Sequence, residues 1–326
     1  MARSTIDGDS RTGVAYRLLY GRTDTRLRAV WRVLAPLAVG IGIYALGHTL
    51  VGTYGGDVLA PFAGESAVFA AAATFAALTV VIAAASLAAL AVATRLDRRS
   101  IAEYGFDRSR RWRRDFLAGV GIGAAAGIGA VGYMAARGYA TLSIDPTGVG
   151  ADSALVGVVV LVALLAFLLV NNVFEEIVFR AILITNAAEG FRSRSVGAVT
   201  AVVGAVAVSL PMFGALHLLG GGIGAVVTSA VAGILFAAAY VLTGRLALPI
   251  GVHFGGIALV SVLQSPLSAE PEVTLPSLVV VADALELSLL ASVELWLVRL
   301  AIGLALVCAW VRLTYGELSI ADRVSP

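Results

Sequence analysis

Two adjacent glutamates stand at the end of a long apolar run, in the stretch NNVFEEIVFR from Asn171 to Arg180. An ionisable side chain at bilayer depth is costly, so such residues are usually paired, turned toward the protein interior and functional. On a helix, Glu176 and Arg180 lie four residues apart on one face, which predicts an ion pair. Glu175 is rotated by about 100° from Glu176, so we expect its carboxyl to remain unpaired and to serve as a general base. The pair alone is also compatible with a purely structural role between two helices.

Two amides precede the glutamates and could orient them. Asn171 lies four residues before Glu175, and Asn172 lies three residues before Glu175 and four before Glu176. Residues three or four apart are neighbours on a helix surface. We therefore expect both amides to support the carboxylates.

Two of the three histidines also stand in apolar runs. His217 ends the stretch SLPMFGALH, in which Phe213 would stack on the imidazole and Pro211 would kink the helix. His253 ends the stretch LPIGVH. One glutamate and two histidines could hold a catalytic zinc with an open position, or act as a base with polarising donors. The spacing does not decide between them, because no HExxH-type pair fixes two ligands on one helix.

The rest of the chain predicts the membrane helices that must position these residues. It has 326 residues, of which 59% are hydrophobic and 13% charged. A soluble chain is nearer half apolar and a quarter charged, and the apolar residues here form runs of roughly the 20 residues that cross a bilayer. We therefore predict an all-α, polytopic transmembrane helix bundle without a separate soluble domain. The eight predicted spans lie near 33–52, 66–94, 116–136, 153–174 (running on toward 190), 196–219, 222–243, 246–264 and 290–311.

Arginines predict the orientation of the bundle. The arm 1–32 carries seven of them and the loop 95–115 carries eight, whereas Arg137 stands alone in the opposite loops. By the positive-inside rule both termini are cytoplasmic, which agrees with an even number of spans in an integral cell-membrane protein. We divide the chain into this arm, a transmembrane domain (33–314) and a short cytoplasmic tail (315–326). The net charge of +2 is then a topology signal, so we expect the lipid bilayer and not nucleic acid as a partner.

The last predicted span carries three further residues of interest. Cys308 is the only cysteine, which excludes an intrachain disulfide. Glu294 lies near the outer interface and Arg299 about one turn deeper. We expect both charges to reach the interface by snorkelling.

Three motifs in chain order resemble those of a known family. FEEIVFR reads as E-E-x-x-x-R, FGALH as F-x-x-x-H, and LPIGVH opens a third histidine motif. Together they resemble the CPBP family, which includes the type II CAAX prenyl endopeptidases and the bacteriocin-processing or self-immunity proteins of the Abi group. The resemblance covers a protease-like core of about residues 95–263.

This resemblance implies an α-helical intramembrane protease and a role for each motif residue. It implies that Glu175 activates water together with His217, while Glu176 and Arg180 support the site. It also implies that His253 stabilises the oxyanion of the tetrahedral intermediate. The family is described both as metal-dependent and as using a metal-free glutamate mechanism. In the metal-dependent form, His217, His253 and Glu175 would hold one divalent ion, zinc.

The third motif departs from the family pattern. Its usual form is H-x-x-x-N or H-x-x-x-D, but HFGGI places Ile257 at the polar position. Loss of one oxyanion donor typically costs about 2.7–4 kcal/mol of transition-state stabilisation. Asn172 or Asn171 could supply the amide instead. The alternative is a non-catalytic membrane scaffold or immunity-type relative, and a third class is a proton-coupled transporter that uses the glutamate pair as a relay.

The sequence leaves the substrate open. A CAAX-type prenylated peptide, a bacteriocin-like peptide and a membrane-anchored regulator are all compatible with it. Because irregular backbone at bilayer depth is tolerated only next to protein or water, we expect a water-filled cavity around Glu175 that opens toward the cytoplasm.

Overall fold

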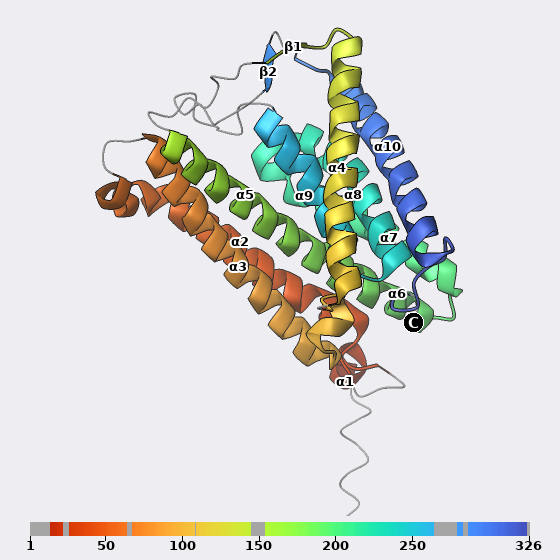
Figure 1. Ribbon diagram of the computed structural model, residues 1–326. Helices are drawn as coiled ribbons and strands as arrows, with labels where there is room; N and C mark the ends of the chain where they lie inside the picture. The colour runs from red at the N-terminus through yellow and green to blue at the C-terminus, as the bar shows by residue number, and fades with distance from the viewer. Residues whose placement is uncertain are drawn as a thin grey trace, which may run out of the picture.

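The computed structural model describes residues 14–21, 26–63, 67–107, 109–144, 154–263, 279–282 and 286–324. Nearly all of this part of the chain is helical (Figure 1). The elements in chain order are α1 (Val14–Leu19), α2 (Ala29–Ala63), α3 (Ala67–Asp97), the 3₁₀ helix η1 (Ile101–Tyr104), α4 (Arg110–Ala136), β1 (Thr141–Ile144), α5 (Ala154–Glu176), the π-helix η2 (Ile177–Ile184), α6 (Thr185–Arg192), α7 (Ala198–Leu216), α8 (Leu218–Thr243), α9 (Ala247–Leu263), β2 (Val279–Ala282) and α10 (Leu289–Tyr315).

The predicted transmembrane helix bundle is confirmed. Among the described residues, seven helical stretches are long and apolar enough to cross a membrane. The eighth predicted span is α9, whose 17 residues are shorter than the roughly 20 that a full crossing needs. The fourth span continues as predicted, because α5, η2 and α6 follow one another without a break up to Arg192. Both termini remain a prediction, and the arm 1–32 and the tail 315–326 lie only partly within the described residues.

Two short strands were not predicted. β1 pairs antiparallel with β2, with Thr141 opposite Ala282 and Ile144 opposite Val279. They join the segment after α4 to the segment before α10 at one end of the bundle (Figure 1).

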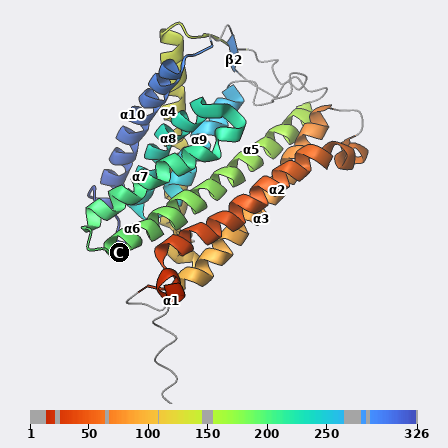
Figure 2. The same cartoon turned by 180° about the vertical axis from the view of Figure 1, so that it is seen from behind.

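The helix that carries the second motif histidine is held by backbone contact. A Cβ on Gly123 of α4 would lie under 3.0 Å from the Val252 carbonyl oxygen, and one on Gly251 would lie under 3.0 Å from the Phe116 carbonyl oxygen. Small residues allow such close approach of membrane helices. α9 is therefore fixed against α4, which leaves its opposite face for α5 and α8. Figure 2 shows α5 between the pair α2 and α3 on one side and α7, α8 and α9 on the other.

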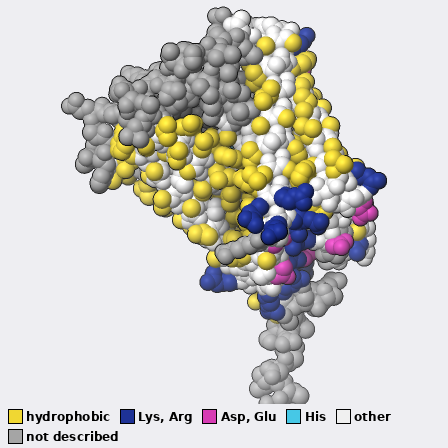
Figure 3. Space-filling model, in the orientation of Figure 1, with side chains coloured by type: hydrophobic (Ala, Val, Ile, Leu, Met, Phe, Trp, Pro, Cys, Tyr) yellow, Lys and Arg dark blue, Asp and Glu magenta, His cyan; other side chains and the backbone are white. Residues whose placement is uncertain are grey.

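Charged side chains gather at the end of the molecule that carries α1, α6 and the C-terminus, next to a broad hydrophobic surface (Figure 3). Part of this charge is buried and paired: Arg32 donates to Asp97 at 3.2 Å and to Glu189 at 2.8 Å. Asp97 also accepts from Tyr104 and Asn186. This network fastens α2, α3, η1 and α6 together below the buried π-helix.

Candidate active site

Both motif glutamates lie where an α-helix changes into a π-helix. Glu175 and Glu176 are the last residues of α5, and η2 begins at Ile177. Short π-helical segments inside α-helices are frequent at functional sites. The two side chains are well buried, since Glu175 is 3% exposed and Glu176 is fully buried.

Glu176 is paired with Arg180, as the spacing predicts. Glu176 Oε2 and Arg180 Nε are 3.1 Å apart, and both side chains are inaccessible to solvent. The charges are in contact, although the N–H direction does not meet hydrogen-bond geometry. The guanidinium also lies 4.3 Å from the centre of the Phe213 ring, a cation–π distance. Phe213 thus supports the arginine.

His253 joins the two glutamates from α9. Its Nδ1 lies 2.9 Å from Glu176 Oε1, and its Nε2 lies 3.7 Å from Glu175 Oε2. The imidazole stacks on the Phe236 ring of α8 with centroids 4.1 Å apart. The short bond to Glu176 and the ring stack together fix where Nε2 lies relative to Glu175.

Glu175 is held by one oxygen only. Asn171 Nδ2 donates to Glu175 Oε1 at 2.8 Å, and the Tyr44 hydroxyl donates to Asn171 Oδ1 at 3.1 Å. Oε2 is buried and has no hydrogen-bond partner among the described residues. A relay of two hydrogen bonds from α2 therefore orients the carboxyl and leaves one oxygen available.

Asn172 does not support a carboxylate in the way we expected. In the amide orientation that satisfies both of its ends, Nδ2 donates to the Leu168 carbonyl at 3.3 Å and Oδ1 accepts from the Phe254 N–H at 3.1 Å. The amide thus ties α5 to α9 next to His253. Its partners are backbone groups because its side chain points across the helix interface.

His217 lies at the end of α7, one residue after Leu216. Its Nδ1 lies 3.1 Å from the Phe213 carbonyl oxygen. The ring meets Phe213 edge to face, with an interplanar angle of 72°, so the predicted stacking on its face is wrong. Within the described part of the chain, no hydrogen bond or ion pair joins His217 to either glutamate. Phe213 lies between the two histidines, with its centroid 5.1 Å from His217 and 6.1 Å from His253.

Ile257 occupies the motif position at which the family usually has a polar residue. Its side chain packs on an apolar cluster formed by Ala72, Val160, Leu164 and Leu168. This cluster lies on the α5 residues one to three turns before the glutamates. The substitution therefore serves helix packing on the same face that carries His253.

The donors of the site do not form a zinc-binding set. Within the described ranges, no group of three or more His, Cys, Asp or Glu side chains is placed to hold a metal ion. His253 Nδ1 is used by Glu176, and His217 Nδ1 lies against a backbone carbonyl. A three-ligand site needs such nitrogens to converge on one point. We therefore route no step of the reaction through a metal.

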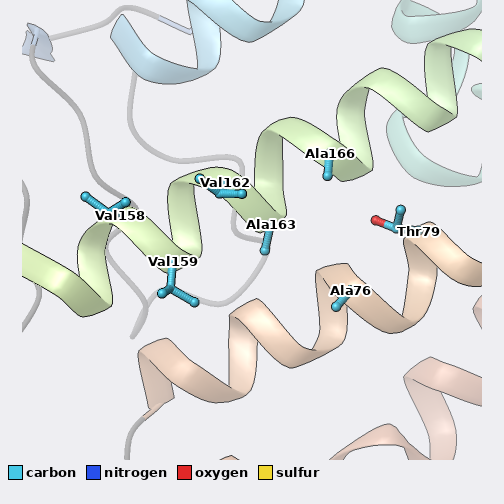
Figure 4. A pocket seen from close by; sticks show the side chains of 7 residues that line it. All are labelled: Ala76, Thr79, Val158, Val159, Val162, Ala163 and Ala166. Carbon is cyan, nitrogen blue, oxygen red and sulfur yellow. The ribbon is translucent and has the colours of Figure 1, made fainter.

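The cavity expected around Glu175 is not open. With 3% exposure, the carboxyl is closed off from solvent in this conformation. An open groove of about 430 Å³ lies elsewhere, between α3 and α5 (Figure 4). Its lining is apolar and consists of Ala76, Thr79, Val158, Val159, Val162, Ala163 and Ala166.

Two residues of the site have no signal in the sequence motifs. Tyr44 was hidden in the first apolar run, and only a polar ring facing the bundle interior could have pointed to it. Phe236 is one apolar residue among many in α8. Arg299 is the third correction: it is 9% exposed and does not snorkel, whereas Glu294 pairs with Arg137 at 3.3 Å.

A comparison with protein families agrees with this geometry. Residues 157–259 match the family model described as type II CAAX prenyl endopeptidase Rce1-like. The core of this chain belongs to the CPBP family. The match spans roughly a third of the chain and contains the three motifs, whereas Tyr44 and Arg299 lie outside it. No curated protein matches the chain, and no solved structure matches it.

Proposed function

We propose that this protein is an intramembrane endopeptidase that hydrolyses a peptide bond within or beside the bilayer. Family membership of the core supports protease activity at the level of the family. The observation that carries the proposal is the state of Glu175: one oxygen accepts from Asn171, and the other is buried without a partner 3.7 Å from His253 Nε2.

In the proposed reaction, Glu175 is the base. Its Oε2 takes a proton from a water molecule while the water oxygen attacks the carbonyl carbon of the peptide bond. The negative charge then rests on the former carbonyl oxygen. When the C–N bond breaks, the proton held by Glu175 passes to the leaving nitrogen. The products are a carboxylic acid and an amine, and no metal is needed to balance the step.

The remaining motif residues set the electrostatics of this step. Arg180 neutralises Glu176, so Glu175 need not share its surroundings with a second unpaired charge. Glu176 in turn holds His253 Nδ1, and His253 Nε2 is the nitrogen available on the Glu175 side. We assign His253 to the oxyanion, because a preorganised donor is worth most where charge develops.

His217 has a separate role in the proposal. A backbone carbonyl only accepts hydrogen bonds, so the Nδ1 of His217 that lies against Phe213 carries the hydrogen. In the neutral ring Nε2 is then an acceptor. We propose that it accepts a hydrogen bond from the attacking water and shares its activation with Glu175.

The buried carboxyl requires a conformational step before catalysis. Because Glu175 is closed off, helices around α5 must separate to admit water and an extended peptide. Such opening excludes bulk water again once substrate is bound. We propose that the substrate is a peptide or protein in the membrane, either prenylated, bacteriocin-like or otherwise membrane-anchored.

A second function is favoured by Ile257. A residue that packs on an apolar cluster offers no donor to an oxyanion, so a non-catalytic scaffold or immunity-type protein is the alternative. Its discriminating property is indifference to Glu175: a scaffold needs the fold and not the carboxyl.

The test compares protein termini by mass spectrometry in host membranes that carry wild type or Glu175→Gln at equal expression. A glutamine keeps the carbonyl oxygen that accepts from Asn171, so the fold is preserved. New termini present only with the wild type are the expected result and would also identify a substrate. Identical sets of termini would favour the scaffold.

A further inference from the structure

Arg299 of α10 is a buried cation that the proposed reaction does not use. It is 9% exposed, and the only partner recorded for it within the described residues is the Trp296 ring, whose centre lies 4.6 Å from the guanidinium. Neither an ion pair nor a hydrogen bond joins it to another described residue. A buried guanidinium without a carboxylate is unusual in a membrane protein, because intramembrane charges are generally paired or mark a substrate pathway.

The surroundings of Arg299 are shaped to hold its guanidinium against α9. A Cβ on Gly256 would lie under 3.0 Å from Arg299 Nη2. Only a glycine at this position lets the guanidinium approach the α9 backbone so closely. A small cavity of about 10 Å³, enough for roughly one water molecule, lies beside it and is lined by Ala232, Leu235, Phe236, Trp296, Arg299 and Leu300.

This cavity adjoins the candidate active site through one aromatic ring. Phe236 lines the cavity and also stacks on His253 at 4.1 Å. Gly256 lies three residues after His253 and so shares its side of α9. The unpaired cation therefore lies one ring beyond the histidine assigned to the oxyanion.

We propose that Arg299 binds a carboxylate of the peptide substrate, one to three residues to the C-terminal side of the bond that is cut. This inference rests on the proposed endopeptidase function and names a feature of its substrate. Each extended residue spans about 3.3–3.6 Å, so a chain cut beside His253 brings a carboxylate of this kind past Phe236. The planar guanidinium suits a carboxylate because two parallel N–H groups bind its two oxygens.

Two carboxylates fit this chemistry, namely the C-terminal carboxylate of the peptide and an acidic side chain near its end. A lipid phosphate is the competing source of negative charge. The small cavity favours the peptide, because a phosphate with its glycerol chains requires far more space than a side chain or a chain end. Closure of the cavity matches closure at Glu175, so one opening step serves both.

The first test measures binding without catalysis. Glu175→Gln is reconstituted in phosphatidylcholine vesicles, with or without Arg299→Gln, and fluorescence anisotropy follows labelled peptides that carry a cleaved sequence found in host membranes. Three peptides are compared: the free acid, the C-terminal amide, and the amide with its acidic side chains neutralised. We expect a carboxylate to improve affinity by roughly ten- to a hundredfold, and Arg299→Gln to abolish this difference while binding the fully neutral peptide as before.

Controls separate the possible failures. Arg312 is an exposed arginine on the same helix, so Arg312→Gln should leave the preference intact, and Arg299→Lys should retain part of it. Equal loss of affinity for all three peptides, or no preference before substitution, would overturn the proposal. So would an effect of Arg299→Gln that appears only when phosphatidylglycerol is added to the vesicles.

The proposed function fails independently of this result. Its failure is the absence of any Glu175-dependent cleavage by the wild type. Affinity for the free acid that depends on Arg299 would still be measured in that case, and it would then assign the carboxylate site to a binding protein.

Discussion

The relay Tyr44–Asn171–Glu175 predicts a graded loss of activity along its length. Asn171 Nδ2 donates directly to the catalytic carboxyl at 2.8 Å, whereas the Tyr44 hydroxyl acts only through Asn171, at 3.1 Å. Asn171→Leu keeps the volume of the side chain and removes the direct bond. Tyr44→Phe keeps the ring, which stacks on Phe174, and removes the hydroxyl alone.

The magnitudes follow from the type of each bond. A hydrogen bond to a charged group is worth about 1.5–3 kcal/mol, and one between neutral groups about 0.5–1.5 kcal/mol. Since about 1.36 kcal/mol corresponds to a tenfold change in rate, we expect kcat to fall roughly 10- to 150-fold for Asn171→Leu. For Tyr44→Phe we expect a fall of roughly 2- to 12-fold. The double variant should be no slower than Asn171→Leu alone, because the hydroxyl then has nothing to orient.

The assay is the rate of peptide cleavage by protein reconstituted in liposomes, with kcat and KM determined separately. Tyr54 is 58% exposed on the same helix, so Tyr54→Phe is the matched control and should be neutral. A fall in kcat at unchanged KM and unchanged melting temperature would support a positioning role. Additive losses in the double variant, or an equal loss in the control, would refute the relay.

Three further predictions concern the surroundings of the site. Arg180→Gln leaves Glu176 buried without its counter-charge, so the free energy of unfolding should fall by about 3–5 kcal/mol, measured by thermal melting in detergent, and an unchanged melting temperature would contradict the pairing. Gly251→Ala forces a Cβ onto the Phe116 carbonyl and should lower stability by about 1–3 kcal/mol, whereas Gly121→Ala, where a Cβ meets nothing within 4 Å, should be neutral or stabilising; equal effects would argue against the α4–α9 contact. A chelator should leave the cleavage rate unchanged, and loss of activity that added zinc restores would contradict the metal-free step.

The membrane helices could be predicted because their signal is local. Each apolar run is long enough to cross a bilayer, and the predicted ranges differ from the observed helices by only a few residues, except for longer ends on α2 and α4. The ion pair Glu176–Arg180 could be predicted for the same reason, since spacing of four residues on one helix fixes both side chains.

Contacts between helices could not be predicted in this way. His253 and Glu176 are 77 residues apart, and nothing in either motif states that they share a hydrogen bond. Whether Arg299 snorkels or turns inward depends on Gly256, a residue of a different helix. The direction of the Asn172 amide likewise depends on a backbone N–H of α9. Such partners are set by tertiary packing and leave no periodic trace in the sequence.

The central claim is that Glu175 is the base while Glu176 holds the site together. The most direct measurement takes the cleavage rate and the melting temperature of Glu175→Gln and Glu176→Gln from the same reconstituted preparations. We predict that Glu175→Gln keeps the wild-type melting temperature and loses cleavage, whereas Glu176→Gln, which leaves Arg180 and His253 without their carboxylate, lowers the melting temperature. Cleavage by a folded Glu175→Gln variant at the wild-type rate would contradict the account.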